Sequence, residues 1–268
     1  MLKKKSLSLS LVLLPLLFIG VFLAISQAKR ISEYTFDQGA IIRGNVSEKR
    51  IALIFTGHEF SDGGEFIRDA LNKRKIKAGF FFTGDFYRAP ANAGLISHLI
   101  EDGHYLGPHS DKHLLYCSWE KREELLVSQK EFSSDIRENY KALAAFGIAK
   151  ERAPYFIPPY EWYNETVADW AKDLGLVLFN FTPGTASNAD YTTPSMPEYK
   201  SSEQIYKSII DYEKSDPHGL SGFILLIHIG THPDRKDKFY WRMDDLLGYL
   251  QEKGYAFIRV DELLKERR

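Results

Sequence analysis

The chain has 268 residues, of which 44% are hydrophobic and 14% aromatic, enough to build the core of one large domain. Its 35 Lys and Arg nearly balance its 36 Asp and Glu. No broad charge field therefore favours binding to a nucleic acid or to an anionic membrane surface. A single cysteine, Cys117, excludes an internal disulfide, so the fold must be stabilised by its core.

The N-terminal residues have the pattern of an export signal. Lysines at positions 3 to 5 precede an apolar run from Leu7 to Ile25, and the small residues Ser26 and Ala28 follow. The apolar run approaches the ~20 residues of a membrane-spanning helix, so an uncleaved N-terminal anchor is the alternative. Residues 1–28 therefore predict a protein body outside the cytoplasm, either periplasmic or secreted, and possible membrane attachment only through this segment.

After a linker and lead-in at residues 29–48, short apolar strands alternate with amphipathic helices through a single domain at residues 49–268. The predicted strands are 51–55, 78–83, 104–107, 153–157, 176–180, 222–228 and 256–260. The predicted helices are 65–73, 91–102, 121–146, 165–174, 202–214 and 242–253. About seven parallel strands alternating with helices favour a distorted (β/α) barrel over an open sheet, with chemistry on the loops after the strands.

Unusually polar segments follow five of the predicted strands. They are residues 56–62, 109–113, 158–164, 182–190 and 228–232. Because the carboxyl ends of barrel strands meet at one rim, the His, Asp and Glu residues of these segments are expected to converge there. The sequence therefore predicts a functional site at this rim.

Two of these segments carry the most specific motifs. In GPHSDKH, His109 and His113 stand four residues apart, about one helical turn, so both imidazoles can face one divalent cation, with zinc the best match. In GFILLIHIGTHP, His228 ends an apolar strand, where an imidazole can protonate a leaving group. The alternative for the first motif is that His109 and His113 are unrelated loop histidines. The alternative for the second is that His228 is an ordinary histidine at the end of a buried strand.

These motifs resemble the NodB-homology polysaccharide deacetylases, carbohydrate esterase family 4, over roughly residues 48 to 264. HSDKH matches the family's H-[ST]-x-x-H motif, LLIH matches L-x-[IL]-H, and KAGFFFTGDF is similar to its ATFF strand. IPPYEW lies where R-x-P-Y-G is expected, and NADY lies where a D-W dipeptide often occurs. The resemblance implies a metal-dependent hydrolase that removes N- or O-linked acetyl groups from a polysaccharide or oligosaccharide. It also implies that His228 is the general acid.

The first motif of the family, T-F-D-D-G, is altered in this chain. Its first Asp is the general base and its second is a metal ligand, but residues 54–58 read Ile-Phe-Thr-Gly-His. The Arg that normally pairs with the base is replaced by Ile157. In the same loop, His58 is placed to complete a three-histidine metal site, and Glu59 or Asp62 to bind the metal or act as the base. The alternatives are an exposed Glu59 and an Asp62 that caps the following helix.

Five further residues are expected to contact the substrate. By family analogy, the backbone N–H near Tyr160 stabilises the oxyanion. Glu161, in the usual place of a glycine, is a sugar-hydroxyl acceptor or a further candidate base, and Trp162, Tyr163 and Tyr191 are expected to line sugar subsites.

Two other functions are compatible with this sequence. One is a non-catalytic carbohydrate-binding protein that lost its base, and the other is a hydrolase of a non-acetyl amide C–N bond. Retention of the histidine pair together with His228 favours the deacetylase.

Overall fold

The computed structural model describes residues 34–265, so the predicted signal or anchor at residues 1–28 lies outside the described part. Within that part, no helix is both long enough and apolar enough to span a membrane. The strands are β1 (Thr35–Asp37), β2 (Ala40–Arg43), β3 (Arg50–Gly57), β4 (Gly79–Phe82), β5 (Tyr105–Pro108), β6 (Tyr155–Phe156), β7 (Val177–Leu178), β8 (Phe223–His228) and β9 (Ala256–Ile258). The α-helices are α2 (Gly64–Lys73), α3 (Gly84–Arg88), α4 (Ala93–Glu101), α5 (Gln129–Ala144), α6 (Glu165–Asp173), α7 (Ser202–Ser215), α8 (Met243–Glu252) and α9 (Val260–Leu263).

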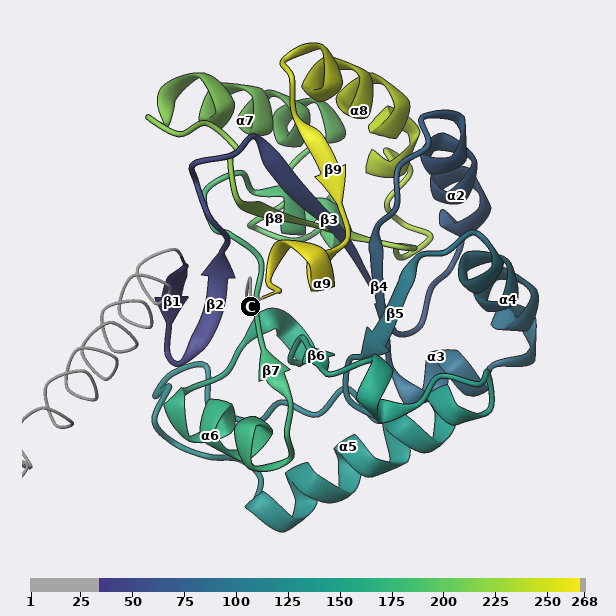
Figure 1. Ribbon diagram of the computed structural model, residues 1–268, viewed down its shortest axis with the longest axis vertical. Helices are drawn as coiled ribbons and strands as arrows, with labels where there is room; N and C mark the ends of the chain where they lie inside the picture. Colours follow the sequence, from purple (N-terminus) through teal and green to yellow (C-terminus); the bar gives the residue numbers. More distant parts are fainter. Residues whose placement is uncertain (1–33, 266–268) are drawn as a thin grey trace, which may run out of the picture.

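A parallel sheet forms the centre of the molecule, with helices around it (Figure 1). Its strands run in the order β5-β4-β3-β8, and β9 pairs with the beginning of β3. Seven of the eight residues of β3 are buried, which explains its almost continuous apolar sequence. The parallel register places Thr56 of β3 opposite His228 of β8, so these strands end at the same rim.

A second parallel pair, β6 and β7, completes the ring of strands through a few single contacts. On one side, the N–H of Thr182, just after β7, donates to the carbonyl of Ile224 in β8 (3.0 Å). On the other side, the N–H of Tyr155 donates to the hydroxyl of Tyr105 in β5 (3.0 Å). Because single hydrogen bonds, rather than continuous strand pairing, connect β6 and β7 to the central sheet, the ring is a distorted (β/α) barrel, as the sequence predicts.

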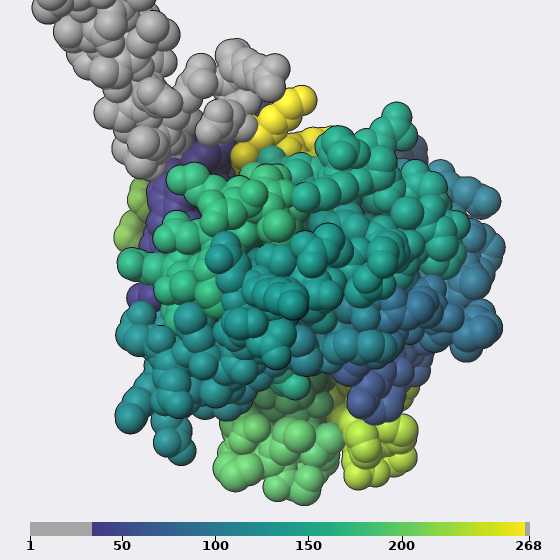
Figure 2. Space-filling model, turned by 90° about the horizontal axis from the view of Figure 1, so that it is seen from below, coloured from purple at the N-terminus to yellow at the C-terminus, as the bar shows by residue number. Residues whose placement is uncertain are grey.

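The two ends of the barrel differ. Helix α9 covers the amino end of the strands, where Val260 packs against Gly79, the first residue of β4. In Figure 2 the yellow C-terminal segment lies on one side of the molecule, and green and yellow-green segments from the second half of the chain project on the opposite side. The carboxyl ends of the strands are therefore left for the functional loops.

All seven predicted strands are present, but the prediction lacks helices α3 and α9, and two further segments differ from it. The predicted lead-in contains the β1–β2 hairpin, which adds to the barrel through a bridge between Ile41 and Phe179. The predicted helix 121–146 begins only at Gln129, because Ser128 and Glu131 form a capping box that starts the helix there. Residues 116–126 instead form a hairpin, with a bridge between Cys117 and Leu125.

Removal of this cap should destabilise the fold measurably. Ser128→Ala deletes the hydroxyl that accepts from the N–H of Glu131, and we expect the free energy of unfolding in urea to fall by about 1 kcal/mol. Ser97→Ala, on the exposed face of α4, is the matched control, because its hydroxyl donates to the carbonyl of Ala93 and caps no helix. An equal loss in the two variants would contradict the capping role.

Candidate functional site

Three of the predicted site histidines gather at the rim. His58 follows β3, and His109 and His113 lie in the loop after β5. The ring centroids of His109 and His113 are 5.1 Å apart, and those of His58 and His113 are 4.7 Å apart. The expected convergence of distant loops is therefore present for these residues.

His109 is held in one tautomer by the barrel. Its Nδ1 lies 2.9 Å from the carbonyl oxygen of Ile157, and its backbone N–H donates to the side chain of Asn139 (3.0 Å). A carbonyl can only accept, so Nδ1 carries the proton and Nε2 presents a lone pair. Burial lowers the pKa of His109 to about 3, so the ring is neutral near pH 7. This is the form in which an imidazole binds a metal ion.

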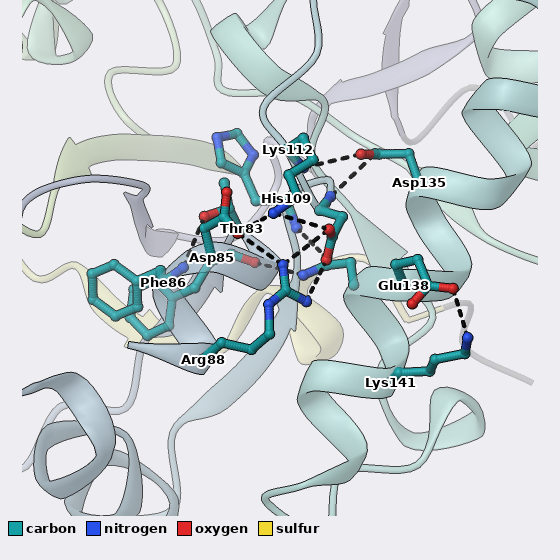
Figure 3. Close-up of polar contacts among 12 residues, drawn as sticks. Thr83, Asp85, Phe86, Arg88, His109, Lys112, Asp135, Glu138 and Lys141 are labelled. Carbon is teal, nitrogen blue, oxygen red and sulfur yellow. Dashed lines mark hydrogen bonds and ion pairs between the residues drawn. The ribbon is translucent and has the colours of Figure 1, made fainter. Parts of the chain in front are cut away.

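A polar network fixes the loop between His109 and His113 (Figure 3). From α5, Asp135 accepts the N–H groups of Asp111 and Lys112, at 3.1 and 3.0 Å. From α3, the guanidinium of Arg88 binds both carboxylate oxygens of Asp111, at 2.7 and 2.9 Å. A Cβ on Gly84 would lie 1.8 Å from Asp111 Oδ1, so this close approach requires a glycine. Both histidines therefore stand on a loop fixed from two sides.

The rings of His109 and His113 lie close together. Their ring planes are inclined by 62°. For a tetrahedral ion with N–metal bonds of about 2 Å, two imidazole centroids lie about 5 Å apart, close to the 5.1 Å observed. Burial, followed by the neighbouring histidines, lowers the pKa of His113 to about 2, so this ring is also neutral. The two neutral rings are therefore at a separation compatible with one shared metal ion.

His58 does not complete the three-histidine set that the sequence predicts. Its ring stacks on that of His113 with an interplanar angle of only 10°, and its Nδ1 lies 3.1 Å from Thr83 Oγ1. Ring-nitrogen lone pairs lie in the ring plane, so two stacked, parallel rings cannot direct them at one ion. Among residues 34–265, no three or more His, Cys, Asp or Glu side chains are grouped to hold a metal. In this structure His58 is a stacking partner of His113, and its role as a third ligand stays a prediction.

The position of the second missing carboxylate, residue 57, is closed by apolar atoms. A Cβ on Gly57 would lie 2.7 Å from Ile229 Cγ2 and 2.9 Å from Phe82 Cδ1. The hydroxyl of Thr56 is buried without a hydrogen-bond partner. A carboxylate at position 57 would therefore require Ile229 and Phe82 to move.

Asp62 and Glu59 do not replace those carboxylates in a metal group. Asp62 Oδ1 accepts the N–H of Thr231, and its Oδ2 binds Tyr240 and the ammonium of Lys238, each at 2.8 Å. Although burial opposes the effect, the hydrogen bond from Lys238 lowers the pKa of Asp62. Asp62 thus fastens its loop to the loop after β8, and it does not cap α2, whose N-cap is Gly63. Glu59 is exposed.

His228 forms a close pair with Asp190 on the other side of the rim. Its Nδ1 lies 2.6 Å from Asp190 Oδ1, and its backbone N–H donates to Oδ2 (2.9 Å). Asp190 is buried in a short 3-10 helix, Ser187–Tyr191. Burial alone would lower the pKa of His228, but the charge of Asp190 raises it above its usual value. Nδ1 is fixed as a donor to Asp190, and Nε2 remains available for a proton transfer.

Asp190 was missed by the sequence analysis, although NADY was noted as a motif. Its signal in the sequence is an acidic residue directly before the aromatic Tyr191. Tyr191 lies beside His228, with ring centroids 5.3 Å apart, and is 42% exposed. Only the fold shows that the carboxylate, rather than the ring alone, serves the imidazole.

Glu161 occupies an unusual backbone position beside this pair. Both Tyr160 and Glu161 have left-handed backbones, with φ of 58° and 54°, a conformation that costs non-glycine residues about 1 kcal/mol or more. The side chain of Asn180 donates to the carbonyl of Glu161 (2.8 Å) and holds the turn. Burial raises the pKa of Glu161 to about 7, and its charge acts on His228. A carboxyl group that titrates near neutrality suits proton transfer.

The predicted aromatic residues are placed differently from one another. Tyr160 is 45% exposed, and its ring centroid lies 4.3 Å from that of His113. Trp162 is partly buried and stacks on Trp119, which the sequence analysis had assigned no role. Tyr163 is fully buried and its hydroxyl donates to the carbonyl of Asp37, so its predicted contact with sugar is corrected to a packing role.

Comparison with known proteins places this geometry in a family. The family model described as polysaccharide deacetylase matches residues 28–179. A peptidoglycan-N-acetylglucosamine deacetylase of Listeria monocytogenes is 26% identical over 82% of this chain, which spans 40% of the length of that relative. A Bacillus cereus protein of the same description is 28% identical over 82% of this chain and 90% of its own length.

Solved structures support the same fold. A family 4 carbohydrate esterase of Bacillus subtilis superposes with a TM-score of 0.65 and 21% identity, over 91% of this chain and 90% of its own. A protein of Bacillus anthracis described as a CE4 family pseudoenzyme has a TM-score of 0.65 and 18% identity, over 87% of this chain and 71% of its own. Since the family model matches more than half of the chain and these folds agree, the chain belongs to the polysaccharide deacetylase family.

Proposed function

We propose that the protein is a hydrolase that removes N- or O-linked acetyl groups from a polysaccharide or oligosaccharide outside the cytoplasm. The observation that carries the proposal is the pair of His228 with buried Asp190, at the same rim as His109 and His113. Relatives named peptidoglycan deacetylases support a cell-wall glycan as the substrate. The export pattern at residues 1–28 is consistent with such a substrate.

In this proposal, His228 is the general acid and Glu161 the general base. A water oxygen bonds to the acetyl carbon while its proton passes to the carboxylate of Glu161. The bond from that carbon to the sugar nitrogen or oxygen breaks, and Nε2 of His228 gives its proton to the leaving atom. A later proton transfer from Glu161 to His228 restores both groups. Glu161 thus takes the role first considered for Asp62 and Glu59.

His109 and His113 are the proposed ligands of a divalent cation, with zinc the best match to two imidazoles. Such a cation would polarise the acetyl carbonyl and lower the pKa of a bound water. The chain's own contribution is to keep both rings neutral by burial and to fix their loop through Asp111 and Asp135. Tyr160, next to His113, is proposed to present its backbone N–H to the oxyanion.

The second candidate function is glycan binding without catalysis. The apolar closure around Gly57 favours it, because the family's second carboxylate has no space there. The existence of a related fold described as a pseudoenzyme makes the test of activity essential.

Acetate release from N-acetylated chitin oligomers and acetylated xylan separates the two functions. We expect His228→Ala to lower kcat by about 10²- to 10⁴-fold, because the leaving group loses its acid. His109→Ala should also remove most activity. His232→Ala is the matched control, since that ring is 50% exposed and lies outside the proposed machinery. Failure of the wild-type protein to release acetate, with binding of the same oligomers retained, would favour the non-catalytic function.

The pH dependence tests the assignment of acid and base. His228 must be protonated, so activity is lost as pH rises through its pKa. Asp190→Asn removes the charge that raises this pKa, so the alkaline limb of kcat/KM should move to lower pH. Glu161 must be deprotonated, so activity should rise with pH near 7, and Glu161→Gln should abolish that limb. An unchanged profile in both variants would assign the proton transfers to other groups.

A further inference from the structure

The hairpin at residues 116–126 carries Trp119 in its turn. The hairpin is closed by hydrogen bonds from the N–H of Ser118 to the carbonyl of Glu124 (2.8 Å) and from the N–H of Leu126 to the carbonyl of Tyr116 (2.9 Å). Trp119 is 56% exposed. A large apolar ring on a tight turn in water is not explained by packing of the core.

The hairpin is fixed to the loop that follows β6. The indole N–H of Trp162 donates to the carbonyl of Ser118 (3.1 Å), and Arg122 Nε donates to the carbonyl of Tyr163 (2.7 Å). The guanidinium of Arg122 also lies over the ring of Trp162, 4.5 Å from its centroid. These contacts join segments about 40 residues apart in sequence and hold the turn in one place.

Three aromatic side chains form a continuous series of ring contacts from the hairpin to His113. We call Trp119, Trp162 and Tyr160 the aromatic platform. Trp119 stacks on Trp162 with centroids 5.2 Å apart and an interplanar angle of 28°, and its edge contact with Tyr160 is at 5.8 Å. Tyr160 in turn contacts His113 at 4.3 Å. The platform therefore begins at the proposed cation site and leads away from it.

The chemistry of the platform selects its ligand. A pyranose with equatorial substituents has a flat C–H face that covers an aromatic ring and a polar edge that stays hydrated, whereas a fully apolar ligand would leave no group for the surrounding polar loop. The guanidinium of Arg122 already lies over the ring of Trp162, which disfavours a cationic ligand there. Because the rings are held in place beforehand, little conformational entropy is lost when a sugar stacks on them.

We propose that the aromatic platform is a glycan subsite, in which Trp119 stacks on a sugar unit next to the unit that carries the acetyl group. The position of the acetyl group in this proposal rests on the proposed function. The binding of a sugar to the platform does not. It names the substrate class as a chain of equatorially substituted pyranoses long enough to reach from His113 to Trp119. A monosaccharide substrate, which has no neighbouring unit, should not sense Trp119.

The test compares Trp119→Ala with Trp241→Ala, a matched control because Trp241 is 55% exposed and lies outside the platform. Binding of fully N-acetylated chitotetraose is measured by calorimetry, and kcat/KM is measured on the tetramer and on the monosaccharide N-acetylglucosamine. We expect Trp119→Ala to weaken tetramer binding about tenfold, the effect of one lost aromatic stack. Trp119→Phe should recover part of it. Activity of Trp119→Ala on the monosaccharide should not change, and Trp241→Ala should show no change on either substrate. Thermal unfolding of each variant verifies its fold.

The outcomes separate this proposal from the proposed function. Weakened tetramer binding in Trp119→Ala, with no acetate release by the wild type, would support the platform and contradict the deacetylase. Acetate release with equal tetramer affinity and kcat/KM in the wild type and Trp119→Ala would support the deacetylase and overturn the platform. Absence of tetramer binding by the wild type would also overturn the platform.

Discussion

Strand β3 is hydrogen-bonded to β4, β8 and β9, and this fixes its carboxyl end at the centre of the rim. In the family, that end supplies two carboxylates, but here it ends in Thr56 and Gly57, with Ile229 and Phe82 packed where a side chain at position 57 would lie. A strand buried between three neighbours cannot shift to recover them without breaking its ladders. The remaining chemistry must therefore come from other strands.

The other strands supply imidazoles whose tautomers are set by fixed acceptors. The carbonyl of Ile157 accepts a hydrogen bond from Nδ1 of His109, and the carboxylate of Asp190 accepts one from Nδ1 of His228. The two acceptors differ in charge, and this difference separates the two proposed roles, metal ligand and general acid. A neutral acceptor in a buried place leaves His109 uncharged, whereas Asp190 raises the pKa of His228 and favours its protonated form.

The sequence predicts the barrel well because its strands are short apolar runs separated by amphipathic helices, and each of the seven is present. It fails where a distant contact decides the local structure. Residues 121–128 have helical periodicity, yet the bonds of Trp162 and Arg122 hold a hairpin there. The sequence makes Asp62 a candidate base, but in the fold its carboxylate pairs with Lys238, which lies 176 positions away in the chain. The stacking of His58 on His113 is likewise invisible to spacing arguments.

The central claim is that the rim keeps a metal-binding pair in His109 and His113 without the participation of His58. Calorimetric titration of the purified protein with Zn²⁺ tests it directly. The account predicts one bound ion in the wild type, little change in affinity in His58→Ala, and no binding in His109→Ala. Loss of binding in His58→Ala would contradict the account, since it would mean that His58 leaves its stack and becomes a ligand.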